Sequence, residues 1–104
     1  MKARSEAAAA IMETVNDLHG MGFVDKETVR SFSLRCQLPE IPRYDAQDIR
    51  ALREKLNVSQ AVMASLLNAT SSTVQKWEQG LKRPNALALK LLNILDRHGI
   101  QALL

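Results

Sequence analysis

Four polar side chains lie close together in the second half of the chain, where a helix is expected to begin. Ser71, Ser72, Gln75 and Lys76 follow Thr70, a residue type that caps helix N-termini, and their spacing places them on one face of that helix. Side chains of these types reach the donors and acceptors of base edges when the N-terminal end of a helix enters the major groove of DNA. The pattern predicts a base-contacting surface, although serines in a first helical turn often serve only the cap.

Other residues around this helix are suited to contact phosphates. Lys82 and Arg83 follow the helix directly, and Gln60, next to the expected cap Ser59, can meet a phosphate through its side chain and the helix N-terminus. Residues 1–44 are neutral overall, so residues 45–104 carry the whole net charge of +3. A local basic patch is the footprint expected of nucleic-acid binding, although scattered cations are more commonly a solvated face.

No residues are spaced for catalysis or for metal binding. Cys36 is the single cysteine, so it cannot form an intramolecular disulfide and fits a reducing cytosol, while His19 and His98 lie far apart. The sequence contains no carboxylate pair, glycine-rich phosphate loop or nucleophile–base arrangement. Its apolar stretches are shorter than the ~18 to 20 residues of a membrane span. We expect a cytoplasmic protein that is not an enzyme and uses no cofactor, metal, membrane or small-molecule substrate.

The elements that position these side chains are expected to be helices. Hydrophobic residues make up 46% of the 104 residues and aromatic residues only 4%, which favours Ala- and Leu-rich helices over a sandwich or barrel. Within residues 45–104, four expected helices begin at capping residues, namely Asp45, Ser59, Thr70 and Asn85. With the short apolar end of the chain, they predict an all-α, five-helix bundle.

The apolar positions of these helices define the expected core. Val74 and Trp77 lie on the side of the third helix opposite its polar face, and the second helix offers either Val62 or Met63. The fourth helix is expected to contribute Leu87, Leu91, Leu92 and Leu95. The final apolar residues would be exposed on a monomer and suggest the seam of a symmetric dimer, formed by Ile100, Leu103 and Leu104.

The first part of the chain is expected to be a separate segment. Ser5 can cap a helix with an apolar stripe, and Asp25 can cap a second, although residues 28–34 also alternate like a strand and the pattern leaves both open. Pro39 and Pro42 then indicate a linker, because proline lacks a backbone donor and holds its predecessor extended. We therefore divide the chain into residues 1–44 and residues 45–104.

The motifs of the second segment resemble a known family. Ser59-Gln60, Trp77-Glu78-Gln79-Gly80 and Arg83-Pro84 occur in the order and spacing of the phage-repressor-type (Xre/Cro) helix-turn-helix domain, over roughly residues 45–97. The resemblance implies an ion pair between Arg53 and Glu78. Asn68 stands where the family usually has glycine, and asparagine accepts left-handed backbone geometry. Ala69 replaces a larger aliphatic residue.

The arrangement of both segments is also similar to antitoxins of the HigA type. That resemblance implies a homodimer that binds double-stranded operator DNA and represses its own operon, together with an N-terminal segment that neutralises a RelE-like toxin, an mRNA endonuclease. The expected toxin-binding residues are Ile11, Val15, Leu18, Phe23 and Phe32.

Other interpretations of the N-terminal segment stay open. Its stripe could pack on the chain's own bundle, which would suit a transcription regulator without a toxin partner. A third possibility is an interaction adaptor that kept the fold and lost DNA binding. We favour a segment that is ordered on a partner, because an Ala-rich helix of this length is marginal alone in water.

Overall fold

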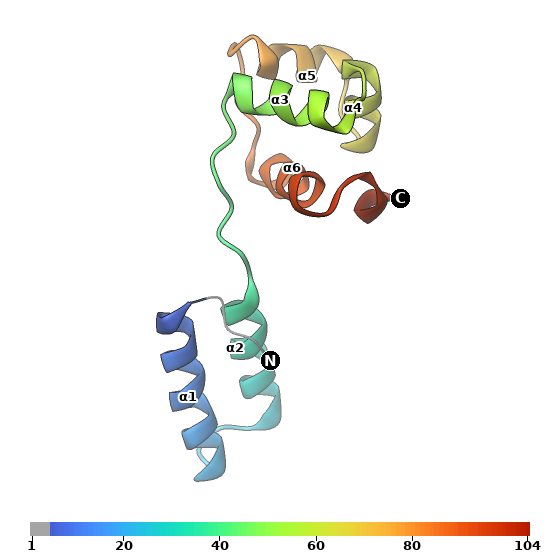
Figure 1. Cartoon of the computed structure of the whole chain (residues 1–104). Coiled ribbons are helices and arrows are strands. Elements are labelled where there is room, and N and C mark those ends of the chain that lie inside the picture. Colours follow the sequence, from blue (N-terminus) through green and yellow to red (C-terminus); the bar gives the residue numbers. More distant parts are fainter. Residues whose placement is uncertain (1–4) are drawn as a thin grey trace. The chain divides into compact units, whose positions relative to one another are not determined.

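Every regular element that the computed structural model describes, within residues 5–104, is a helix, which confirms the predicted all-α class (Figure 1). The chain divides between Glu40 and Ile41 into two compact units. The first unit, the N-terminal hairpin, contains α1 (Glu6–Gly20) and α2 (Lys26–Gln37). The second unit, the C-terminal domain, contains α3 (Ala46–Leu56), α4 (Gln60–Leu66), α5 (Ser71–Glu78), α6 (Ala86–His98) and the 3-10 helix η1 (Ile100–Leu103).

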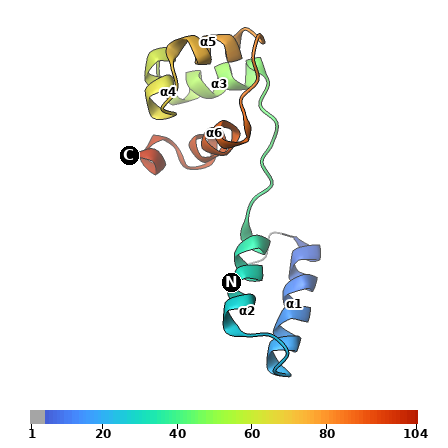
Figure 2. The same cartoon turned by 180° about the vertical axis from the view of Figure 1, so that it is seen from behind.

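The two helices of the N-terminal hairpin lie side by side, as both views show (Figures 1 and 2). Ser5 and Asp25 cap them by accepting hydrogen bonds from Ala8 N and Thr28 N. The residues that could form either a helix or a strand belong to α2. Their helical geometry follows from the Asp25 cap and from burial at Ser33 and Cys36, three positions apart on one helix face.

The helices of the C-terminal domain begin where the capping residues predict. Asp45, Ser59, Thr70 and Asn85 each accept a hydrogen bond from the backbone amide three residues later. Two asparagines occupy the left-handed region, Asn57 after α3 and Asn68 after α4, with φ of 57° and 53°. Asparagine tolerates this geometry better than most residues, which accounts for Asn68 at a position where glycine is usual.

The core of the C-terminal domain contains most of the expected apolar residues. Of the two candidates in α4, Met63 is buried and Val62 is exposed. The expectation that Leu87 belongs to the core is wrong, because it lies in the first turn of α6 and is 72% exposed. The largest fully buried side chains are those of Ile49, Met63, Val74, Leu92 and Leu95.

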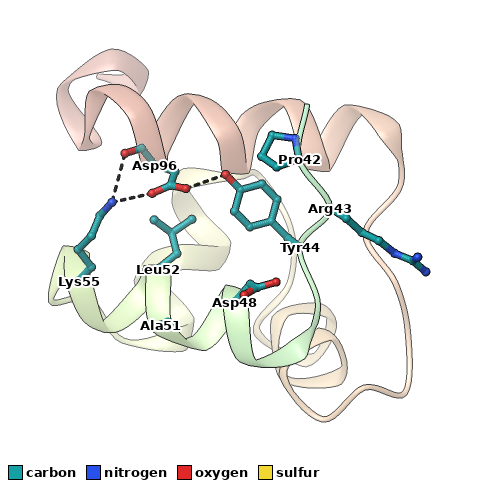
Figure 3. Close-up of a pocket in the computed structure, with 8 residues that line it drawn as sticks. All are labelled: Pro42, Arg43, Tyr44, Asp48, Ala51, Leu52, Lys55 and Asp96. Carbon is teal, nitrogen blue, oxygen red and sulfur yellow. Dashed lines mark hydrogen bonds and ion pairs between the residues drawn. The ribbon is translucent and has the colours of Figure 1, made fainter. Parts of the chain in front are cut away.

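Tyr44 belongs to the core of the C-terminal domain, so this unit begins before residue 45. Its hydroxyl donates to Asp96 Oδ2 at 2.8 Å and accepts a hydrogen bond from Asn93 Nδ2 at 3.3 Å. Lys55 Nζ also donates to Asp96 Oδ1, at 2.6 Å, so α3, α6 and the end of the linker meet at one carboxylate (Figure 3). These hydrogen bonds, Lys55 first and then Tyr44, hold the pKa of Asp96 below its ordinary value.

Candidate nucleic-acid interface

The predicted recognition helix, α5, has one buried and one exposed side. Val74, Trp77 and Glu78 are buried. Thr70 at the N-cap accepts a hydrogen bond from Thr73 N at 3.1 Å, and the two threonine hydroxyls lie 2.8 Å apart. The exposed side carries the predicted base-contacting residues together, which are Ser71, Ser72, Gln75 and Lys76. A rigidly seated helix thus offers hydroxyl, amide and ammonium groups to a groove, the groups that hydrogen-bond to base edges.

A buried carboxylate, that of Glu78, ties the C-terminal end of α5 to α3. Glu78, whose side chain is 1% exposed, accepts hydrogen bonds from Arg53 Nε at 2.8 Å and from Arg53 Nη2 at 3.0 Å. Arg53 Nη1 also donates to Val58 O at 3.2 Å, so one guanidinium links α3, α5 and the loop before α4. The structure therefore contains the ion pair between Arg53 and Glu78 that the family resemblance implies.

The pKa values of this pair shift in the directions that favour the charged forms. Burial acts to raise the pKa of Glu78, but hydrogen bonds from Arg53 and Gln60 outweigh it, and the pKa lies below its ordinary value. The hydrogen bonds to Glu78 raise the pKa of Arg53 despite its partial burial. Both groups are therefore ionised at neutral pH.

Gln60 and Arg50 lie at the edge of this ion pair. Gln60, a predicted phosphate contact, is half-buried at the start of α4 and hydrogen-bonds to Glu78. Arg50 Nε lies 3.5 Å from Glu78 Oε1, and its side chain is 55% exposed. Sequence reasoning missed Arg50, although its position one helical turn before Arg53 could have indicated a second cation on the same face.

Lys82 and Arg83 are exposed in the loop after α5. The chain turns at Gly80, whose φ is 75°, and Leu81 N donates to Lys76 O at 3.0 Å. This hydrogen bond closes the C-terminal end of α5 and starts the loop beside Lys76. The loop thus brings its two cations to the C-terminal end of α5.

Three of the five predicted toxin-binding residues come together in the N-terminal hairpin. Ile11, Val15 and Phe32 line a shallow apolar groove of about 390 Å³ between α1 and α2. Val15 is itself buried there, whereas Ile11 is 48% exposed. Phe23 is exposed in the loop between the helices, and Leu18 is half-buried, both outside the residues that line this groove.

The predicted dimer residues are not equally exposed. Ile100 and Leu103 are half-buried against the core of the C-terminal domain, so the expectation that a monomer exposes them is wrong, because η1 folds back onto the bundle. Leu104 is 81% exposed. Leu87, Leu81 and Val62 are further apolar side chains that this domain leaves at its surface.

Within residues 5–104, no group of three or more His, Cys, Asp or Glu side chains is placed to hold a metal ion. None of the helices described in that range has both the length and the apolar character needed to cross a membrane.

Comparisons with known proteins match both units of the chain. The model of a family described as the antitoxin component of a bacterial toxin-antitoxin system, MqsA, matches residues 5–102. Antitoxin HigA-2 of Vibrio cholerae serotype O1 is 43% identical over 51 residues, which are 49% of each chain. A putative HTH-type transcriptional regulatory protein of Methanothermobacter thermautotrophicus is 29% identical over 97 residues, 86% of this chain and 31% of that protein. The chain thus spans about half of the length of HigA-2 and about a third of the archaeal protein.

Proposed function

This chain belongs to the family of MqsA, the antitoxin component of a bacterial toxin-antitoxin system, and from that membership we propose that it neutralises a toxin protein and represses transcription of its own operon. The C-terminal domain binds operator DNA, and the N-terminal hairpin binds the toxin. In this proposal neither unit performs catalysis.

The exposed face of α5 is the observation that carries the DNA-binding part of the proposal. Gln75 and Lys76 stand on this face, while Val74 and Trp77 fix the helix on the core behind it. Inserted into a major groove, α5 would place these polar groups at base edges. Lys82 and Arg83 would then meet the phosphates beside that groove, as would Gln60 at the start of α4 and Arg50 in the middle of α3.

The apolar groove of the N-terminal hairpin supports the toxin-binding part. A partner side chain inserted between Ile11 and Phe32 would remove their exposed apolar surface from water, at about 25 cal/mol per Å². Phe23 and Leu18 would contact the partner beside this groove. We propose a RelE-like toxin as the occupant, as the resemblance to HigA-type antitoxins implies.

A homodimer completes the proposed repressor. Two copies joined through the exposed Leu104, with the half-buried Ile100 and Leu103 of η1 beside it in the chain, would remove apolar surface that the C-terminal domain exposes. The exposed Leu87, in the first turn of α6, would be covered by the same dimer. A symmetric pair would also present two α5 helices to half-sites about 34 Å apart.

The two parts of the proposal can be tested separately in the full-length chain. Ile11→Asp places a charge in the apolar groove, so it should abolish co-purification of the small protein encoded beside this gene and leave operator binding unchanged. Lys76→Ala should weaken operator binding and leave this co-purification unchanged. Ala9→Asp adds the same charge to an exposed position of α1 outside the groove and serves as the matched control. If Ile11→Asp and Ala9→Asp capture the neighbouring protein equally well, the groove is not its binding site.

A transcription regulator without a toxin is the second candidate function. The similarity to the archaeal HTH-type regulator favours it, because that match covers 86% of this chain. Failure of the unaltered chain to capture the neighbouring protein, together with preferential binding to the upstream DNA, would establish this alternative.

A further inference from the structure

A groove at the start of the C-terminal domain gathers cations from two separate segments. It has a volume of about 730 Å³ and lies between the residues before α3, the end of α5 and the loop after α5. Arg43 lines the groove from the residues before α3, and Lys82 and Arg83 line it from the loop after α5. Trp77 and Gly80 belong to the same lining, so the groove adjoins the C-terminal end of the recognition helix.

The neighbouring Tyr44 fixes Arg43 at this position. The Tyr44 ring is buried in the core, and its hydroxyl is held by Asp96 and Asn93. Figure 3 shows the Arg43 side chain directed away from that cluster, in the opposite sense to the Tyr44 hydroxyl. Arg43 therefore belongs to the C-terminal domain and is attached to its anchored Tyr44, although its place beside Pro42 indicated a linker.

The three cations are available for a ligand. Within residues 5–104, Arg43, Lys82 and Arg83 are exposed and form no ion pair or side-chain hydrogen bond with one another or with other groups. Two carboxylates also line the groove, but Asp45 accepts a hydrogen bond from Asp48 N at 2.8 Å, and Asp48 accepts one from Asp45 N at 3.0 Å. The capping box of α3 holds these carboxylates at the helix N-terminus, and neither forms an ion pair with the three cations.

We propose that Arg43 is a DNA-backbone contact, which with Lys82 and Arg83 binds phosphates of the strand that passes the end of α5. This inference rests on the proposed operator binding and extends its footprint to a residue outside the helix-turn-helix motif. A guanidinium can bind a phosphate through two parallel hydrogen bonds. Such a contact does not depend on the base sequence of the DNA. Tyr44 is then a positioning residue, because its buried ring sets where Arg43 stands.

The test is a salt titration of DNA binding with the full-length chain. The probes are a duplex taken from the DNA directly upstream of the reading frame and a scrambled duplex of the same composition. Arg43→Gln should reduce the slope of log affinity against log salt by about 0.9 on both duplexes, the value for one lost phosphate contact. For a fourfold change in salt, that slope difference equals about 3.5-fold in affinity. Tyr44→Ala, which removes the anchor, should reduce the slope as Arg43→Gln does.

The matched control is Arg30→Gln, which removes an exposed cation of the N-terminal hairpin and should leave the slope unchanged. An unchanged slope for Arg43→Gln, with the preference for the upstream duplex retained, would overturn this inference and leave the proposed function intact. An unchanged slope with lost capture of the neighbouring protein would assign Arg43 to the protein partner instead. If the unaltered chain binds neither duplex, the proposed function and this inference both fail.

Discussion

Replacing Arg53 by Met should destabilise the C-terminal domain more than replacing an exposed cation of that domain does. Arg53 donates two charge-assisted hydrogen bonds, of 2.8 and 3.0 Å, to a carboxylate that is 1% exposed. Loss of one partner of a buried ion pair typically costs about 3–5 kcal/mol, because the other charge stays buried. Arg50 at 3.5 Å and Gln60 still face Glu78, so we expect the lower end, about 3 kcal/mol.

Urea denaturation followed by far-ultraviolet circular dichroism measures this loss. Lys55→Met is the matched control, because it also removes a cation from an ion pair of α3, but Lys55 and Asp96 are 57% and 38% exposed in their side chains. An exposed pair contributes about 0–1 kcal/mol. A domain of this size has roughly 3–10 kcal/mol of stability in total, so the two variants should differ clearly. Equal losses for Arg53→Met and Lys55→Met would refute the reasoning.

The same pair predicts a dependence of stability on pH. The pKa of Glu78 is lowered in the folded state, so the ionised carboxylate contributes stability above its ordinary pKa of 4.5. This contribution is lost as the pH falls through the lowered folded value. The unaltered chain and Arg53→Met should therefore converge in stability with falling pH. A difference that stays constant into acid would contradict this assignment of the shift.

Four further predictions concern single side chains. Lys76→Ala should weaken operator binding by about 1–3 kcal/mol if it contacts a base, measured by fluorescence anisotropy, and equal losses on scrambled DNA would exclude base reading. Arg83→Ala should lower affinity for all sequences and reduce the salt slope by about 0.9, and an unchanged slope would exclude a phosphate contact. Tyr44→Phe should cost about 1–2 kcal/mol in urea denaturation, because Asp96 and the buried Asn93 each lose a hydrogen-bond partner. Leu87→Asp should shift the chain from dimer to monomer in sedimentation, and an unaltered dimer would place the interface elsewhere.

Local chemistry made the helices of this chain predictable from its sequence. A capping side chain and the amide it binds are three residues apart, so Ser59 and Thr70 indicate their helices without knowledge of the fold. The side of α5 that faces outward was predictable for a similar reason, since Val74 and Trp77 lie one helical turn apart and must share a buried face.

Features that depend on distant contacts were not predictable. Tyr44 lies two residues after Pro42 and looks like part of the linker, because its partners Asn93 and Asp96 are about fifty positions away. Leu87 has the right type and spacing for the core, but α6 turns its first residues outward. In the N-terminal hairpin, periodicity grouped Ile11 with Val15, whereas packing against α2 buries Val15 and leaves Ile11 half-exposed.

The division between Glu40 and Ile41 has a consequence for how such chains can diversify. Each unit supplies its own helix caps and its own buried side chains, so recombination at this point would exchange one hairpin for another and leave the second core whole. A crossover only a few residues later would separate Tyr44 from Asp96 and damage the recipient domain. If the hairpin binds the toxin as proposed, new partner specificities can be acquired by shuffling whole hairpins, provided that the breakpoint precedes the buried tyrosine.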